Sequence, residues 1–233
     1  MSLLNVVVGD ARVLLAVDTA IRFPSSRTFD ELGESVPVAE HASKMTLLVG
    51  TGAVLAVLGS LAMLHDLAYE LVPLEGSFDR MRDALPGTAE RVSAHRQARA
   101  DRLGVNPYVF ESAHIVLAGE SSQGLGAWAV TLEGGKASAP FSLAPWTAHP
   151  SLPGELYSRA PQTHEQVLAI ARDQVKWARA FRPSIAAGGR LVIAEMTPWR
   201  TTITTHDLAT PVAVDHLPLH AAEPQRAATA VHP

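Results

Sequence analysis

The run from Lys44 to Leu71, KMTLLVGTGAVLAVLGSLAMLHDLAYEL, constrains the fold more than any other part of the chain. No formally charged residue lies between Lys44 and Asp66, so the run is long enough to cross a bilayer as a single helix. A second interpretation divides the same residues into two buried strands, joined by a tight turn, and a following helix. The two interpretations are incompatible, and the assignment of the whole chain depends on the choice between them.

The local sequence favours two strands and a helix. Gly50-Thr51-Gly52 is typical of a hairpin turn, because glycine adopts positive φ without steric cost. Ser60 follows a second break at Gly59 and is placed to cap a helix. The flanks of the run also lack the clustered basic residues and the aromatic belt of a membrane span. We therefore predict strand–turn–strand–helix and no membrane partner, with a membrane anchor through residues 45–64 as the alternative.

The helix predicted after Ser60 has apolar residues that recur on one face: Leu61, Leu64, Ala68 and Leu71.

Composition narrows the class of protein. A chain of 233 residues can bury a substantial core as one domain. The net charge of −4 gives no reason to expect a nucleic-acid partner. The absence of cysteine excludes disulfides, thiolate catalysis and cysteine-based metal sites, and it fits a reducing compartment, so we expect a cytoplasmic protein. The opening MSLLNVVVGD lacks a basic segment and does not predict a signal peptide.

The first elements follow from runs of β-branched residues and from breakers. Residues 3–9 and 12–17 predict a β-hairpin that is covered on both faces. Residues 19–43 contain several breakers and predict a long irregular loop. Two helices are expected at residues 77–85 and 88–103, separated by Pro86-Gly87. The arginines of the second helix are interspersed with acidic residues, which indicates a solvated face rather than a nucleic-acid-binding one: Arg91, Arg96, Arg99 and Arg102.

The later elements continue in the same mixed pattern. Strands are predicted at residues 113–119, 127–132, 136–143, 190–196 and 199–205. A loop is predicted at residues 144–159, because it contains three prolines. A helix is predicted from a capping box, formed by Thr163 and Gln166, to about Phe181.

The order of strands, helices, strands, helix and strands fits an α+β fold in four layers, an αββα sandwich. We expect one domain over residues 1–205. Residues 206–233 are rich in Pro, His and Ala without periodicity, so we expect an extended tail there.

At this level the chain resembles proteasome β-type subunits and their bacterial relatives, which are N-terminal-nucleophile (Ntn) hydrolases. The similar segments are SLLNVVVGDARVLLAVDTA at the start, the hairpin that begins at Lys44, the helix start at Gly59-Ser60, AGESSQGLGAWAVTLEGG, and AAGGRLVIAEM after the late helix. The resemblance covers residues 2–205 and rests on the order and character of these segments.

The resemblance implies a site built around the first residue of the mature chain. Ser2 becomes that residue if Met1 is removed, and its α-amino group can then accept the hydroxyl proton. Asp18 and Lys44 match the aspartate and the lysine that the family places beside the nucleophile, and the lysine lowers the hydroxyl pKa. Gly59 matches the family glycine whose backbone N–H contributes to the oxyanion hole.

Each matched residue also has a simpler structural interpretation. Asp18 fits a carboxylate that accepts hydrogen bonds from turn amides at a strand end. Lys44 fits a charged residue that flanks an apolar strand and limits aggregation. Gly59 fits a glycine that is required only for packing.

The chain also departs from the family pattern. Where the family carries Asp-x-x-Ser-Gly-Gly, this chain has Ser184 and Ala187 at the aspartate and serine positions. The family Gly-Ser-Gly stretch is replaced by SLAPWTAHPS. We therefore hold two hypotheses: a Ser-type peptidase or amidase that acts on peptides within a homo-oligomer, and a catalytically inactive structural subunit of a ring or larger particle.

No motif predicts a cofactor or a metal ion. The pair His216 and His220 has Pro218 between its members, which does not fit two ligands on one helical turn. The stretch Gly119-Glu120-Ser121-Ser122-Gln123 resembles a nucleophile elbow but lacks its closing glycine.

Overall fold

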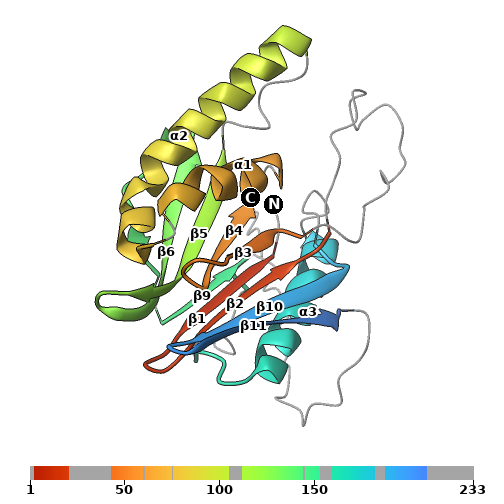
Figure 1. Cartoon of the computed structure of the whole chain (residues 1–233). Coiled ribbons are helices and arrows are strands. Elements are labelled where there is room, and N and C mark those ends of the chain that lie inside the picture. Colours follow the sequence, from red (N-terminus) through yellow and green to blue (C-terminus); the bar gives the residue numbers. More distant parts are fainter. Residues whose placement is uncertain are drawn as a thin grey trace, which may run out of the picture.

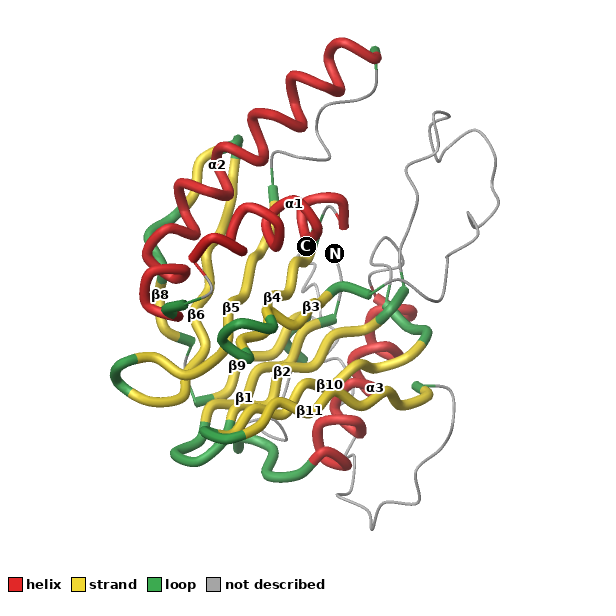
Figure 2. The backbone as a smooth tube through the Cα atoms, viewed as in Figure 1, coloured by secondary structure: helices red, strands yellow, loops and turns green. Residues whose placement is uncertain are grey.

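A computed structural model describes residues 3–20, 43–59, 61–74, 76–104, 112–143, 145–152, 159–181 and 187–208. These residues form an α+β fold of two antiparallel sheets and three α-helices (Figures 1 and 2). The predicted α+β class is confirmed.

The five-stranded sheet contains the opening hairpin and the last two strands that the structure describes. Its order is β11-β10-β2-β1-β9. The bounds are β1 Leu4–Val8, β2 Val13–Asp18, β9 Trp146–His149, β10 Arg190–Thr197 and β11 Arg200–Asp207. β1 and β2 pair with Leu4 opposite Val17 and are buried almost throughout, so the predicted hairpin with two covered faces is confirmed.

The six-stranded sheet contains the run that was ambiguous in the sequence. Its order is β3-β4-β5-β6-β7, and β8 also pairs with β6. The bounds are β3 Met45–Leu48, β4 Ala53–Leu58, β5 Ala113–Ser121, β6 Gly124–Glu133, β7 Lys136–Ala137 and β8 Phe141–Ser142. Helix α1, Leu61–Leu71, follows β4 and leads into a short 3-10 helix, Val72–Leu74.

The prediction of strand–turn–strand–helix is therefore confirmed, and the alternative of one membrane helix through residues 45–64 is wrong. The chain reverses at the predicted turn, where Gly52 adopts a φ of 69° that favours glycine. The proposed capping residue, Ser60, lies outside the described residues. Among the described residues, no helix combines the length and the apolar character that a membrane span requires.

Three buried clusters hold the helices and sheets together. The first joins α1 and α2 to the six-stranded sheet and includes Leu55, Leu67, Leu85 and Ile115. The second lies between the two sheets and includes Val6, Leu15, Ala56 and Val116. The third joins the five-stranded sheet to helix α3, His164–Phe181, and includes Leu14, Ala171 and Ile193. Figure 1 shows α1 and α2 beside one sheet and α3 beside the other.

The two helices predicted around Pro86 are one continuous helix, α2, Phe78–Leu103. Proline cannot donate the hydrogen bond to the carbonyl four residues earlier, which costs about 3 kcal/mol inside a helix. The buried face nevertheless continues across it, with Met81 and Leu85 before the proline and Ala89 and Val92 after it. Packing of this face against α1 and the sheet outweighs the local preference for a break.

The arginines of α2 lie on the solvated side, as expected from their acidic neighbours. Arg96 forms a two-bond ion pair with Asp66 of α1, and one of these bonds measures 2.7 Å. A guanidinium nitrogen of Arg91 lies 3.7 Å from the Oε2 atom of Glu70 of α1. These contacts give the two arginines a role in joining the helices.

Three other predictions need correction. The predicted loop at residues 144–159 contains β9, which pairs with β1 and places His149 opposite Leu4. The predicted tail begins too early, because His206 and Asp207 complete β11 and pair with β10. Residues 209–233 lie outside the described residues, as do residues 21–42 of the predicted long loop. The predicted strand at residues 136–143 is divided into β7 and β8.

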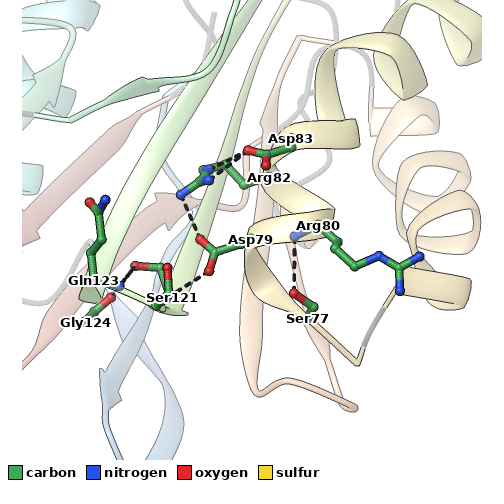
Figure 3. Close-up of polar contacts among 9 residues, drawn as sticks. Ser77, Asp79, Arg80, Arg82, Asp83, Ser121, Gln123 and Gly124 are labelled. Atoms are coloured by element: carbon green, nitrogen blue, oxygen red, sulfur yellow. Dashed lines mark hydrogen bonds and ion pairs between the residues drawn. The ribbon is translucent and has the colours of Figure 1, made fainter.

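The start of α2 is fixed to the turn between β5 and β6 (Figure 3). The Oδ2 atom of Asp79 accepts a hydrogen bond of 2.9 Å from the Ser122 backbone N–H, and Arg82 pairs with the other oxygen at 2.8 Å. The Ser121 hydroxyl donates to the Gly124 carbonyl within the turn. The stretch that resembles a nucleophile elbow is therefore a hairpin turn held by α2.

The N-terminus of α3 has the predicted capping residue. The Gln166 backbone N–H donates to the Thr163 hydroxyl at 3.2 Å. The Gln166 side chain, however, accepts from the Gln162 backbone N–H rather than from Thr163. Of the two hydrogen bonds of a capping box, the one to the Thr163 hydroxyl forms and the one from the Thr163 backbone N–H to the Gln166 side chain does not.

Candidate functional site

Several strand ends meet at one end of the two sheets. Leu3 lies just before β1, Asp18 ends β2, Lys44 lies just before β3, and Gly188 lies before β10. The Thr19 backbone N–H donates to the Arg190 carbonyl, and the Arg190 backbone N–H donates to the Thr19 hydroxyl, each at 2.9 Å. These two bonds fix the end of β2 to the start of β10. This end of the molecule therefore brings together residues that are far apart in the sequence.

Asp18 is at the centre of this cluster. Its Oδ1 atom accepts hydrogen bonds from the Leu3 backbone N–H at 2.9 Å and from Lys44 Nζ at 2.6 Å. Its Oδ2 atom accepts from the Gly188 backbone N–H at 3.0 Å. The side chains of Asp18 and Lys44 are 0% and 3% exposed, so this ion pair is excluded from solvent.

Burial and mutual attraction act in opposite directions on this pair. Burial raises the pKa of Asp18, whereas the charge and hydrogen bond of Lys44 and the amides of Leu3 and Gly188 lower it. Burial lowers the pKa of Lys44, and Asp18 opposes that shift. Burial therefore makes the ammonium group of Lys44 easier to deprotonate than that of an exposed lysine.

The structure places three of the four predicted site residues. Asp18 and Lys44 are in contact, as the resemblance implied. Ser2 lies outside the described residues, but its neighbour Leu3 donates directly to Asp18. A carboxylate and an ammonium group thus lie beside the first described residue of the chain.

Gly59 follows β4, at the same end of its sheet as Lys44. The Val57 backbone N–H donates to the Lys44 carbonyl at 3.0 Å, which ties the end of β4 to the start of β3. Gly59 has a φ of 124°, and a Cβ atom there would lie 2.9 Å from the Ser112 carbonyl oxygen. Glycine is therefore required at this position by conformation and by packing, whatever the role of its N–H.

Two further features of this end have only weak signals in the sequence. Gly188 precedes β10 in a Gly-Gly pair, and its backbone N–H donates to Asp18 at 3.0 Å. His114 and His149 come from different sheets, and their ring centroids lie 5.9 Å apart. His149 lies opposite Leu4 and His114 lies opposite Leu58, which precedes Gly59. The sequence predicts a loop at residues 144–159 and no strand there. The pairing of β9 with β1 is what brings these histidines together.

Of the two residues that depart from the family's Asp-x-x-Ser-Gly-Gly pattern, the structure describes one, Ala187. Ala187 directly precedes Gly188, so an alanine stands where the family carries a serine. Ser184 lies outside the described residues. Within the described part of the chain, no group of three or more metal-ligating side chains could hold a metal ion.

Comparison with known proteins adds no family assignment. No protein-family model matches this chain, and no curated protein matches it either.

Proposed function

We propose that the chain is an Ntn-hydrolase scaffold, in which the two sheets and their covering helices form the four-layer αββα sandwich of that superfamily. Three buried clusters support this proposal. One lies between α1, α2 and the six-stranded sheet, one lies between the two sheets, and one lies between the five-stranded sheet and α3. In the proposed reaction class, a terminal hydroxyl hydrolyses a peptide or amide bond within a homo-oligomeric assembly.

One observation carries the proposal. The buried ion pair of Lys44 and Asp18 is bonded to the N–H of Leu3, the residue that follows the proposed nucleophile. A buried ion pair is rarely the most stable use of a core position, because desolvation offsets its attraction. Its location beside the start of the chain therefore favours a role in chemistry there.

Each group has a definite part in the proposed reaction. The Ser2 hydroxyl attacks the substrate carbonyl, and its proton passes to the α-amino group of Ser2 and then to the departing amine. Lys44 stabilises the developing negative charge of the hydroxyl oxygen, and Asp18 holds Lys44 in place. The N–H of Gly59 stabilises the oxyanion, and water then hydrolyses the acyl-enzyme.

Intact-mass analysis combined with labelling tests the proposal. We expect the purified chain to lack Met1 and to gain one adduct from a hydroxyl-directed electrophile. The variant Ser2→Ala should show the same processing without the adduct. A chain that lacks Met1 but gains no adduct at any pH would contradict the hydrolase activity.

A second candidate is a catalytically inactive subunit of the same fold. The observation that favours it is Ala187, which places a methyl group next to the Gly188 amide that holds Asp18. No hydroxyl is then available at that position to relay a proton. Retention of Met1 in the intact mass, together with a stable assembled particle, would favour this candidate over the hydrolase.

A further inference from the structure

β11 forms an open edge of the five-stranded sheet. All eight of its residues pair with β10, from Arg200 opposite Thr197 to Asp207 opposite Arg190. In the part of the chain that the structure describes, no strand pairs with its other side. Figure 1 shows β11 at the margin of its sheet. Alternate residues of such a strand direct their backbone N–H and C=O groups outward.

The middle of this edge lacks the features that usually protect open strands. Its sequence, RTTITTHD, contains no lysine and no proline, and its register with β10 is continuous without a bulge. Threonine and isoleucine are favourable in strands. Ile203, at the middle of the edge, is 43% exposed, and Trp199, at the adjoining hairpin tip, is 93% exposed. The edge is thus regular and apolar at its centre, and at its end the Asp207 carbonyl accepts a hydrogen bond of 2.8 Å from Arg172.

We propose that β11 pairs with β11 of a second copy of this chain in an antiparallel, two-fold arrangement centred on Ile203. The pairing joins two five-stranded sheets into one continuous sheet. It goes beyond the proposed hydrolase function and does not depend on it.

The distribution of charge favours a second copy in the antiparallel orientation. The only formal charges of β11 are Arg200 at one end and Asp207 at the other. Antiparallel copies bring the positive end of each strand beside the negative end of its partner, whereas parallel copies bring like charges together. The strand is thus complementary to itself in one orientation only.

The register about Ile203 also pairs similar side chains. Ile203 lies opposite Ile203 of the second copy, and Thr202 lies opposite Thr204 of the second copy. Cross-strand pairs of these types are favourable. Arg200 lies opposite His206 of the second copy. Burial, and then the charges of His164 and Arg172, lower the pKa of His206, which favours its neutral ring.

The contact area of one edge strand is small compared with about 800 Å² per partner in a standard interface. Association through β11 should therefore be concentration-dependent unless neighbouring side chains, such as Trp199, add to it. We expect a monomer–dimer equilibrium of this edge by analytical ultracentrifugation. Ile203→Lys places two positive charges together at the centre of the pair and should weaken association at least about tenfold.

Cysteine cross-linking tests the pairing and its register in the full chain, which contains no other cysteine. Opposed residues in an antiparallel pair have Cα atoms about 4.5–5.5 Å apart, within the range for a disulfide. Under mild oxidation, Ile203→Cys should form a disulfide-linked dimer. Thr205→Cys is the matched control, because it is exposed on the same face of the same strand but is not opposed to itself.

The comparison of variants decides the outcome. A strong cross-link in Ile203→Cys with little in Thr205→Cys supports the proposal. Equal cross-linking of the two variants, preferential cross-linking of Thr204→Cys, or a native chain that stays monomeric at every concentration would overturn it. Unchanged circular dichroism and thermal melting of the reduced variants would exclude misfolding as the cause.

Discussion

The two ends of the paired sheets differ in how they use polar residues. At the end that holds Asp18, an ion pair and two backbone amides are bonded out of contact with solvent. At the opposite end, the hairpin turns carry polar bonds that are partly exposed, such as the Thr201 hydroxyl to the Gly52 carbonyl at 2.6 Å. Trp199 and Val49 are largely exposed there, at 93% and 80%.

This difference separates polar residues that the fold needs from those that the proposed chemistry needs. The exposed bonds at the hairpin end need little desolvation and fit a role in fixing turns. The buried pair needs the desolvation of two charges, which its attraction repays only with good geometry and additional hydrogen bonds. We therefore infer that the pair is retained for the proposed site, and the predictions below are ordered by their expected effect.

Removal of the lysine should have the largest effect. Lys44→Met leaves Asp18 buried without its ionic partner, and we expect the free energy of unfolding to fall by about 3–5 kcal/mol. Urea denaturation measures the change. The double variant Asp18→Leu with Lys44→Met should recover part of the loss, because no buried charge remains. A single variant as stable as the native chain would show that the pair is not buried.

The loss in Lys44→Met should also depend on pH. Lys44 lowers the pKa of Asp18, so its removal raises that pKa further above 3.8, the value expected in the unfolded chain. A carboxyl group with a raised pKa favours the folded state at low pH, and this contribution is lost as the pH rises through the folded value. The variant should therefore be less destabilised at about pH 4.5 than at about pH 8. The opposite trend in urea denaturation would contradict the assignment.

Substitution of Gly59, beside the candidate site, should have the next largest effect on stability. Gly59→Ala must accept both a positive φ and a close contact with the Ser112 carbonyl, which we expect to cost about 1–3 kcal/mol. Gly124→Ala is the matched control at the hairpin end, with a φ of 104° and no neighbouring atom within 4 Å of the added Cβ. Thermal unfolding should show a larger loss at Gly59. Equal losses would mean that the contact with Ser112 is unimportant.

The smallest effect is expected at the hairpin end. Hydrogen bonds from Ser122, and then the charge of Arg82, lower the pKa of the solvent-accessible Asp79. A lowered pKa stabilises the folded state above about 3.8, and this contribution is lost as the pH falls through the folded value. Asp79→Asn should thus cause a slight loss of stability at neutral pH that disappears in acid. A loss that persists at low pH would indicate a packing effect instead.

The elements that the sequence predicted well are those with a strong local pattern. The opening hairpin, the strand–turn–strand–helix from Lys44 and the helix after Thr163 each have a clear apolar period or a breaker at the correct place. The contact between Asp18 and Lys44 was expected from the family resemblance. No local pattern in the chain specifies it, because the two residues come from different sheets.

The missed elements depend on tertiary contacts. Pro86 and Gly87 predict a helix break, but the buried face of α2 continues on both sides of them. β9 lies between prolines and has no strand pattern of its own, and its pairing with β1 supplies the missing hydrogen bonds. The contribution of Gly188 could not be predicted for the same reason, since it acts through its backbone N–H and not through a side chain.

The most direct measurement of the central claim is the position of the adduct within the chain after reaction with a hydroxyl-directed electrophile. Peptide mapping by mass spectrometry compares Ser2 with Ser121, whose hydroxyl is bonded within a hairpin turn at the other end of the sheets. We predict an adduct on Ser2 alone, which is lost in Lys44→Met protein that is still folded. An adduct shared equally among the serines, or no adduct on a chain that begins at Ser2, would contradict a nucleophile activated by the buried pair.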